Sequence, residues 1–466
     1  MNNPQAIAEI QSGKLILTIP PDRPPCGSLR YALGFPFQAG PHTCGLMVMR
    51  MTEETPNYGF LDGSDVILLD ELKPPHPKQI FAASRSEIES NAADNTQRLL
   101  LRSPLIGGFV PLGALRANGT PHPHAGTGFG LAQAHRFPFR DGRFSWGDPE
   151  RVDLNEIFQF SYDGKTFSSQ SSAISSQNDD SSLRIGDSGW SILVSGLSNA
   201  IPDGDDLLFA VMAARVDGTA VGIGVIRWAC RQGTWKAVGY DPVVTTSGPV
   251  PQGPNPKERC PWMEPSLARA KDNSLFFSAR GADSFQQEGD VGQGYGLSVW
   301  HSVKAGEWNQ VLGEPRTRLN SPVTINMTTD GSPYLVSNPY DPAFVPETTQ
   351  TGRGREKLVL WPLTEEGTKL APFRLVRNCL TEFGLPPTPT DRGALPENWM
   401  ADHPNGVSVR LKDGHWHHLL AYRICHSPRY IPSGAKPSPH SGCYIDEIIS
   451  QGPAQPAWRF AEDRTV

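Results

Sequence analysis

Two acidic and two basic residues stand out because their types suit chemistry on an acidic sugar. Glu264 precedes Arg280 by sixteen residues, and Asp402 precedes Arg423 by twenty-one. Paired carboxyl groups carry out glycoside hydrolysis, one as the acid and the other as base or nucleophile. The planar guanidinium group of arginine binds a carboxylate through two parallel hydrogen bonds. We therefore predict that Glu264 and Asp402 are catalytic and that Arg280 and Arg423 bind a substrate carboxylate.

Other interpretations of these residues stay open. One alternative is purely structural: Glu264 and Arg280 form an ion pair within the fold and do not bind substrate. A second set of side chains suits proton transfer, because histidine exchanges protons near neutral pH and a tyrosine hydroxyl can serve as an acid. The candidates for this alternative chemistry are His135, His403 and Tyr340.

The candidate residues lie on segments that repeat one pattern. Apolar residues alternate with polar ones, a tight turn follows at a small or acidic pair, and the alternation resumes, which is typical of a β-hairpin. The clearest turns are Ser12-Gly13, Asp272-Asn273, Asp330-Gly331 and Asp413-Gly414. A hairpin with outer strands is one blade of a propeller. We predict an all-β fold, a β-propeller formed by one domain, residues 1–466.

Six blades fit the repeats best, with seven as the alternative because residues 61–105 are difficult to assign. The first strand of each propeller blade lines the central channel, where functional groups gather at one end. Aligning the hairpins on their turns brings a set of polar residues to equivalent positions there. Besides the acids and arginines, this set adds Asn338 and Asn405 as substrate-binding candidates, and Trp262 offers an aromatic face for a sugar.

The composition excludes several classes of function. The chain has 466 residues, 38% of them hydrophobic, with 46 glycines and 44 prolines, so it is rich in turns but can form a core. The formal net charge is −6, whereas a nucleic-acid-binding protein typically has an excess of basic residues clustered on one surface. Since no stretch approaches the roughly 18 apolar residues of a membrane helix, we expect neither nucleic acid nor membrane as a partner.

The N-terminus and the cysteines say little about the compartment. Met1 to Pro20 lacks the basic and apolar parts of a secretion signal, which predicts a cytoplasmic protein unless a signal peptide has been removed. The seven cysteines include no CxxC pair and no zinc spacing, so we predict no metal site and no cofactor, leaving a structural calcium ion open. Most thiols are expected to be buried, with a Cys425–Cys443 disulfide as the alternative.

Part of the chain resembles a known superfamily. Trp262-Met263-Glu264-Pro265-Ser266-Leu267, continued by Asp272-Asn273 and Ala279-Arg280, is similar to a blade of the sialidase-like propellers. Ser161 to Phe167 resembles a degenerate Asp-box turn of the same superfamily. The resemblance implies a site where arginines hold a carboxylate, a tyrosine paired with the glutamate is the nucleophile, and an aspartate is the acid and base. In the following blade, Asn338-Pro339-Tyr340 stands where another arginine is implied.

Three functions fit these observations. The leading hypothesis is a carbohydrate-active enzyme, a glycoside hydrolase that acts on a carboxylate-bearing oligo- or polysaccharide at the mouth of the channel. The first alternative is a polysaccharide lyase, which would use His135, His403 and Tyr340 for β-elimination from a uronic acid. The second alternative is a glycan-binding propeller without catalysis.

Overall fold

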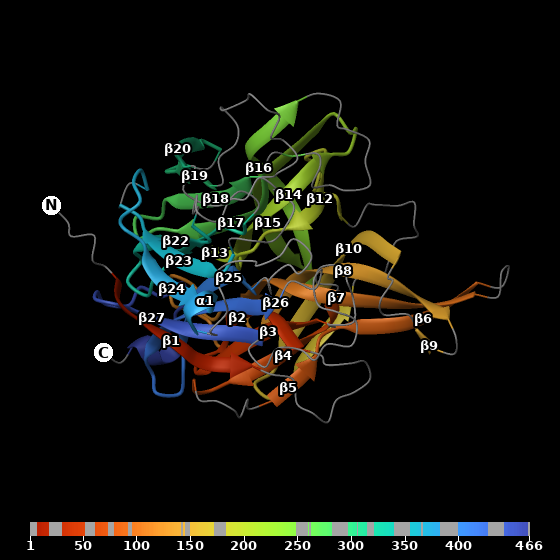
Figure 1. Ribbon diagram of the computed structural model, residues 1–466, viewed down its shortest axis with the longest axis horizontal. Helices are drawn as coiled ribbons and strands as arrows, with labels where there is room; N and C mark the ends of the chain where they lie inside the picture. The colour runs from red at the N-terminus through yellow and green to blue at the C-terminus, as the bar shows by residue number, and fades with distance from the viewer. Residues whose placement is uncertain are drawn as a thin grey trace, which may run out of the picture.

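Most of the described residues lie in β-strands, which form six sheets around a common axis (Figure 1). The computed structural model describes residues 7–17, 30–51, 61–72, 79–91, 96–140, 143–144, 150–171, 183–247, 260, 262–281, 297–304, 306–314, 321–339, 355–364, 367–382, 399–426 and 442–464. The predicted six-bladed β-propeller is confirmed. Residues 61–105, which were difficult to assign, contain two strands of the first blade and the beginning of the second.

The first three blades follow one another along the chain. The first contains β2 (Arg30–Gly40), β3 (Thr43–Met51), β4 (Leu61–Leu69) and β5 (Gln79–Ala82). The second contains β6 (Arg85–Asn91), β7 (Thr96–Val110), β8 (Thr127–Arg140), β9 (Arg143–Phe144), β10 (Glu150–Tyr162) and β11 (Phe167–Ser171). The third contains β12 (Trp190–Ser195), β13 (Ile201–Asp203), β14 (Asp206–Arg215), β15 (Ala220–Arg231) and β16 (Thr234–Ser247).

The last three blades are more regular. The fourth contains β17 (Trp262–Arg269), β18 (Leu275–Gly281), β19 (Leu297–Ser302) and β20 (Asn309–Glu314). The fifth contains β21 (Thr324–Met327), β22 (Pro333–Ser337), β23 (Lys357–Pro362) and β24 (Arg374–Asn378), followed by the short helix α1 (Cys379–Glu382). The sixth contains β25 (Trp399–Arg410), β26 (Trp416–His426), β27 (Gly442–Ser450) and β1 (Ile7–Leu17); the 3-10 helix η6 (Ala461–Arg464) lies near the C-terminus.

The ring is closed by strands from the two ends of the chain. β1 is the outermost strand of the sixth blade and pairs antiparallel with β27. The predicted hairpin at Ser12-Gly13 is therefore wrong. The alternation on both sides of this pair belongs to one strand, whose register shifts between Gln11 and Leu15. A β-bulge inserts extra residues into one strand, and it produces the same local pattern of residues as a tight turn.

Apolar clusters fill the spaces between neighbouring blades. Phe37 of the first blade and Phe109 of the second, with ring centroids 5.2 Å apart, belong to one such cluster, and Leu46 and Leu419 belong to the cluster between the first and sixth blades. Because both faces of a blade are covered, a central strand such as β14 is buried along consecutive residues, 207–213. This packing fixes the six inner strands around the axis.

The hairpin turns share a side-chain hydrogen bond. In the turns at Asp163, Asp272 and Asp413, the aspartate Oδ1 accepts a hydrogen bond from the backbone N–H two residues later, at 2.8–3.0 Å. The residue directly after the aspartate has a positive φ, 94° in Gly164 and 70° in Asn273, a conformation that glycine and asparagine adopt most readily. The predicted hairpins at Asp272, Asp330 and Asp413 are confirmed.

A short segment of the third blade lies across the axis. Residues 196–200 follow β12 and contact four other blades. Leu197 N–H donates to Pro265 O at 2.8 Å in the fourth blade, and Ala200 N–H donates to Gly107 O at 2.6 Å in the second. Asn199 Nδ2 donates to Pro36 O in the first blade. We call residues 196–200 the axial segment.

The described cysteines are free thiols. Cys443 is fully buried, and burial raises the pKa of its thiol to about 12. In the sheet it lies opposite Arg423 rather than Cys425. The Cys425–Cys443 disulfide alternative is therefore wrong, and buried thiols are confirmed for Cys44, Cys230, Cys260, Cys379 and Cys443.

Candidate functional site

Two inner strands contain the same backbone irregularity. The pairing of β17 with β18 shifts register around Glu264, and that of β25 with β26 shifts around His403. Both residues have a positive φ, 50° for Glu264 and 51° for His403, and both precede a proline. This conformation costs a non-glycine residue about 1–3 kcal/mol, and such strain clusters at functional sites. We therefore take the end of the axis at which Glu264 and His403 lie as the candidate site.

An arginine stands beside each bulge. Arg280 of β18 pairs with Met263, and Arg423 of β26 pairs with Asp402. Both arginines are buried, each with 4% of its surface exposed. The fourth and sixth blades thus present the same frame with different side chains.

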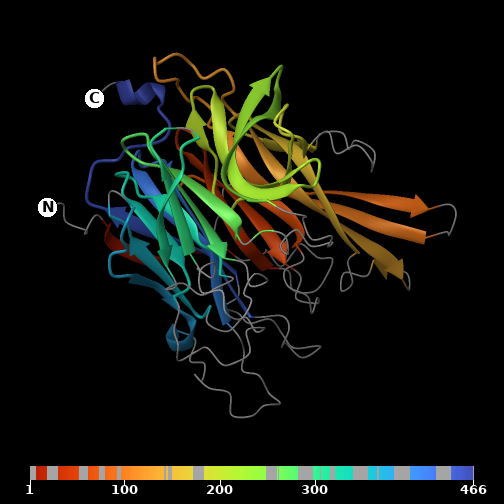
Figure 2. The same cartoon turned by 90° about the horizontal axis from the view of Figure 1, so that it is seen from above.

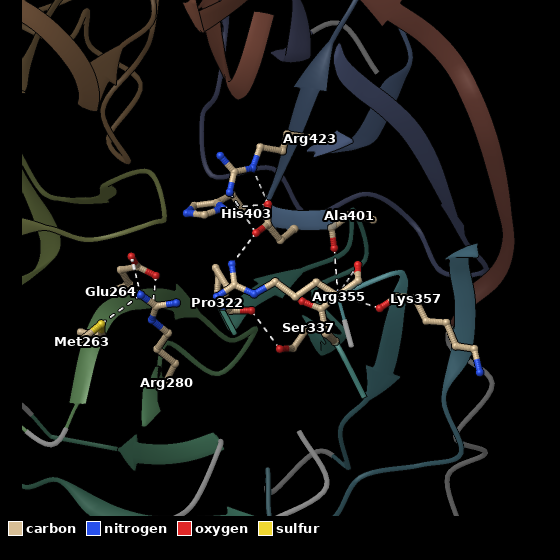
Figure 3. Close-up of polar contacts among 12 residues, drawn as sticks. Met263, Glu264, Arg280, Pro322, Ser337, Arg355, Lys357, Ala401, His403 and Arg423 are labelled. Carbon is tan, nitrogen blue, oxygen red and sulfur yellow. Dashed lines mark hydrogen bonds and ion pairs between the residues drawn. The ribbon is translucent and has the colours of Figure 1, made fainter. Parts of the chain in front are cut away.

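Glu264 and Arg280 form a two-point ion pair (Figure 3). Arg280 Nη2 donates to Glu264 Oε1 at 3.0 Å, and Arg280 Nε lies 3.0 Å from Oε2. The same Nη2 lies 3.0 Å from Met263 Sδ. The Glu264 side chain is 13% exposed and that of Arg280 5%, so the carboxylate is the more accessible member of the pair.

Asp402 is the buried centre of a second cluster. Arg423 donates from Nε to Oδ1 at 2.5 Å and from Nη2 to Oδ2 at 3.0 Å. Arg355 Nη1 donates to Oδ2 at 2.6 Å, and His403 Nδ1 lies 3.0 Å from Oδ1. Asp402 is completely buried. Its carboxylate therefore orients two guanidinium groups and one imidazole.

The protonation states follow from this environment. Burial acts to raise the pKa of Asp402, but the Arg423 charge and His403 outweigh it and hold that pKa well below its usual value. Burial lowers the pKa of His403, and Asp402 opposes this only in part. Near neutral pH the cluster therefore contains an ionised Asp402 and a neutral His403.

Arg355 was not predicted from the sequence. It precedes β23, outside the hairpin repeats, and Asn338 fixes its position. The Arg355 carbonyl oxygen accepts from Ala401 N–H at 2.8 Å and from Asn338 Nδ2 at 3.3 Å. Asn338 Nδ2 also donates to the carbonyl oxygens of Lys357 at 2.7 Å and Ala401 at 2.9 Å. Asn338, predicted to bind substrate, is fully buried and places its amide nitrogen among these three carbonyls.

Figure 3 shows the side chains of Arg280, Arg355 and Arg423 extending into the region between the fourth, fifth and sixth blades. The residue that corresponds in the fifth blade to Arg280 and Arg423 is Asn338, two positions after the partner of Thr324. The third arginine at this end, Arg355, therefore enters from the segment just before β23, next to Asn338. A repeat alignment cannot find it, because its place depends on contacts between blades.

The other predicted residues are distributed differently. Asn405 is 1% exposed, and its Nδ2 donates to Leu197 O in the axial segment. Trp262 begins β17 and lies with its Nε1 3.4 Å from Ser298 Oγ. His135 lies in β8 opposite Leu101, in the part of the second blade that carries β6 and projects beyond the other blades (Figure 2). Tyr340 lies outside the described residues.

Two properties of the described part of the chain bear on cofactors and membranes. Its His, Cys, Asp and Glu side chains form no group of three or more that could hold a metal ion. Its helices include none long and apolar enough to cross a membrane.

No protein-family model and no curated protein matches this chain. Among solved structures, a Dyadobacter fermentans protein of unknown function aligns over 96% of this chain and 100% of its own, with 12% identity and a TM-score of 0.46. A mutant of the Streptococcus pneumoniae NanB sialidase aligns over 94% of this chain and 70% of its own, with 9% identity and a TM-score of 0.46. A Trypanosoma rangeli sialidase in complex with sialic acid aligns over 94% of this chain and 58% of its own, with 10% identity and a TM-score of 0.47. The functional assignment therefore depends on the site itself.

Proposed function

We propose that this protein is a glycoside hydrolase that acts on a carboxylate-bearing glycan at the end of the axis marked by Glu264 and His403. The observation that carries the proposal is the gathering of three arginines, Arg280, Arg355 and Arg423, around two carboxylates, one on the fourth blade and one on the sixth. Guanidinium groups already oriented by buried contacts lose little freedom when they bind a substrate carboxylate.

The two carboxylates have different environments and therefore different roles. Glu264 is partly exposed, so we assign it the proton transfer at the glycosidic bond. Asp402 is buried, ionised and engaged by Arg355 and Arg423. We assign it the orientation of these arginines, in place of the catalytic role that its spacing predicts. The second catalytic group of the hydrolase then has to come from another residue, and Tyr340 stays a prediction for it.

His403 supports β-elimination as a second candidate function. It is neutral near pH 7, its Nδ1 lies 3.0 Å from the Asp402 carboxylate, and its side chain is 16% exposed. A neutral imidazole supported by a carboxylate is suited to act as a general base. A lyase would use this base to remove a proton next to the carboxylate of a uronic acid.

The experiment is an incubation of the purified protein with sialylated, uronic-acid-containing and neutral glycans. Reducing sugar measures all cleavage, and ultraviolet absorbance measures the conjugated double bond that only elimination creates. Reducing sugar without the absorbance is the result expected for the hydrolase. Both signals together would reassign the site to elimination with His403 as base. No cleavage of any glycan would reject an enzyme for these substrates and favour the binding module.

The variant Glu264→Gln tests the assigned residue, and its loss of kcat should be about 10²–10⁴-fold. Glu156→Gln is the matched control, because Glu156 accepts a 2.7 Å hydrogen bond from buried Arg102 in the second blade, away from the site. Full activity in Glu264→Gln would reject Glu264 as the proton-transfer group.

A further inference from the structure

One residue of the axial segment connects the two bulges. Leu197 N–H donates to the carbonyl oxygen of Pro265, directly after Glu264, at 2.8 Å. The Leu197 carbonyl oxygen accepts a hydrogen bond from Asn405 Nδ2, two residues after His403, at 2.5 Å. The two strained residues are thus linked through the backbone of Leu197.

The axial segment is fitted closely against the fourth blade. Ser198 Oγ accepts a hydrogen bond from Leu267 N–H at 2.9 Å. A Cβ atom at Gly196 would lie 2.6 Å from Pro265 O and 2.4 Å from Ala210 O, so a larger residue would displace the backbone. Leu197 and Ser198 are buried. The contact with the bulge at Glu264 therefore depends on a segment with little room to move.

We propose that Asn405 is a positioning residue that holds Glu264 and His403 in their relative places through Leu197. Asn405 is 1% exposed and directs its amide nitrogen at Leu197 O, away from solvent. Without this hydrogen bond, the sixth blade is no longer tied through Asn405 to the segment that supports the fourth. The strained conformations of both bulges then lose a shared support and relax. Asn405 acts on the reaction through these two residues rather than by contact with substrate.

The inference rests on the proposed function for the roles of Glu264 and His403, but its main test needs no substrate. The imidazole of His403 is titrated by NMR in the otherwise unchanged protein, and His403→Gln identifies its resonance. The charged groups that face it are Asp402, Arg423 and Glu264. In Asn405→Leu, relaxation of the bulge should move the His403 pKa toward its usual value by about half a unit or more.

The matched control is Asn199→Leu, the same substitution within the axial segment. Asn199 Nδ2 contacts Pro36 O in the first blade and neither bulge, so the His403 pKa should stay unchanged. Asn405→Gln keeps an amide donor and should retain most of the wild-type titration. If Asn405→Leu does not fold, Asn405→Ser replaces it, because serine is too short to reach Leu197 O. An unchanged His403 pKa in the disruptive variant, or an equal shift in Asn199→Leu, would overturn the proposal.

Kinetics on any glycan that is cleaved separate positioning from binding. Misplacing Glu264 should lower kcat by about tenfold or more with little change in KM. A rise in KM alone would make Asn405 a substrate ligand and overturn the proposal. A shifted His403 pKa in a protein that cleaves no glycan would support the positioning role while rejecting the proposed function.

Discussion

The bulges of the fourth and sixth blades have the same backbone conformation, but different positions in them supply the carboxylate that pairs the arginine. In the fourth blade, Arg280 is paired by Glu264, the residue with positive φ, and its Nη2 lies 3.0 Å from the thioether of Met263, the residue before the bulge. In the sixth blade, the residue before the bulge is Asp402, which pairs Arg423 from the interior.

This difference decides what each bulge residue can do. Burial keeps His403 at the bulge of the sixth blade neutral although the Asp402 carboxylate opposes this in part, so the imidazole can exchange a proton. Because Met263 supplies no negative charge, Glu264 must both pair Arg280 and face the substrate. The two blades thus differ at two positions: Met263 and Glu264 in the fourth correspond to Asp402 and His403 in the sixth, so one bulge presents a carboxylate and the other an imidazole.

The largest expected effect is on stability, in Asp402→Asn. Removing this carboxylate leaves Arg355 and Arg423 buried without the charge that compensates them, which should lower the free energy of unfolding by about 3–5 kcal/mol. Glu264→Gln, at a partly exposed pair, should lose clearly less. Urea unfolding of both variants measures the difference, and equal losses would contradict the contrast between the blades.

The difference in stability between wild type and Asp402→Asn should depend on pH. The pKa of Asp402 is depressed in the folded state, so its contribution is complete above the unfolded value near 4 and is lost as the pH falls through the folded value. The stability gap between wild type and Asp402→Asn should therefore be constant from pH 5 to 7 and narrow below about pH 4.

The second effect is on binding, in the two arginine-to-lysine variants. Lysine keeps the charge but not the planar fork. Arg280→Lys should raise KM about 10–100-fold, the equivalent of one strong charged hydrogen bond, with a small loss of stability. In Arg423→Lys the loss of stability should be larger than the effect on KM, because Nε and Nη2 of Arg423 both donate to the buried Asp402 carboxylate. Steady-state kinetics and urea unfolding of each variant test this division, and the reverse order would refute it.

Local pattern predicted much of the fold and of the site. The turns at Asp272 and Asp413 were predictable because a short hairpin brings its own partners together. The same hairpins carry Glu264 with Arg280 and Asp402 with Arg423, which explains why each acid meets the arginine of its own hairpin.

The missed features depend on contacts between blades. Arg355 reaches Asp402 because Asn338, directly after β22, and Ala401 of β25 hold its backbone. β1 appears as a hairpin in the sequence because its partner β27 lies at the other end of the chain. The axial segment has no periodicity, and Leu197 gains its role only through its contacts with the fourth and sixth blades.

A third effect concerns the pH dependence of His403. Its pKa is lowered by burial, so between the folded and unfolded values the unfolded state binds more protons, and stability rises with pH. Acidification below about pH 6.5 should thus cost wild type up to about 1.4 kcal/mol per pH unit more than His403→Gln. Calorimetry from pH 7 to 5 compares the slopes. Parallel slopes would show that the sixth bulge does not bury its histidine as the comparison requires.

The smallest expected effect is in Met263→Leu, which tests how much the thioether of Met263 contributes to holding Arg280. Leucine fills nearly the same volume but removes the sulfur that lies 3.0 Å from Arg280 Nη2. A volume-conserving change of this kind should cost less than about 1.5 kcal/mol, well below Asp402→Asn at the matching position. Urea unfolding measures the loss, and kcat should change by no more than a few-fold because Glu264 still pairs Arg280 from the solvent side. A loss as large as that of Asp402→Asn would mean that the thioether replaces the aspartate in holding the guanidinium, and the two blades would then anchor their arginines in the same way.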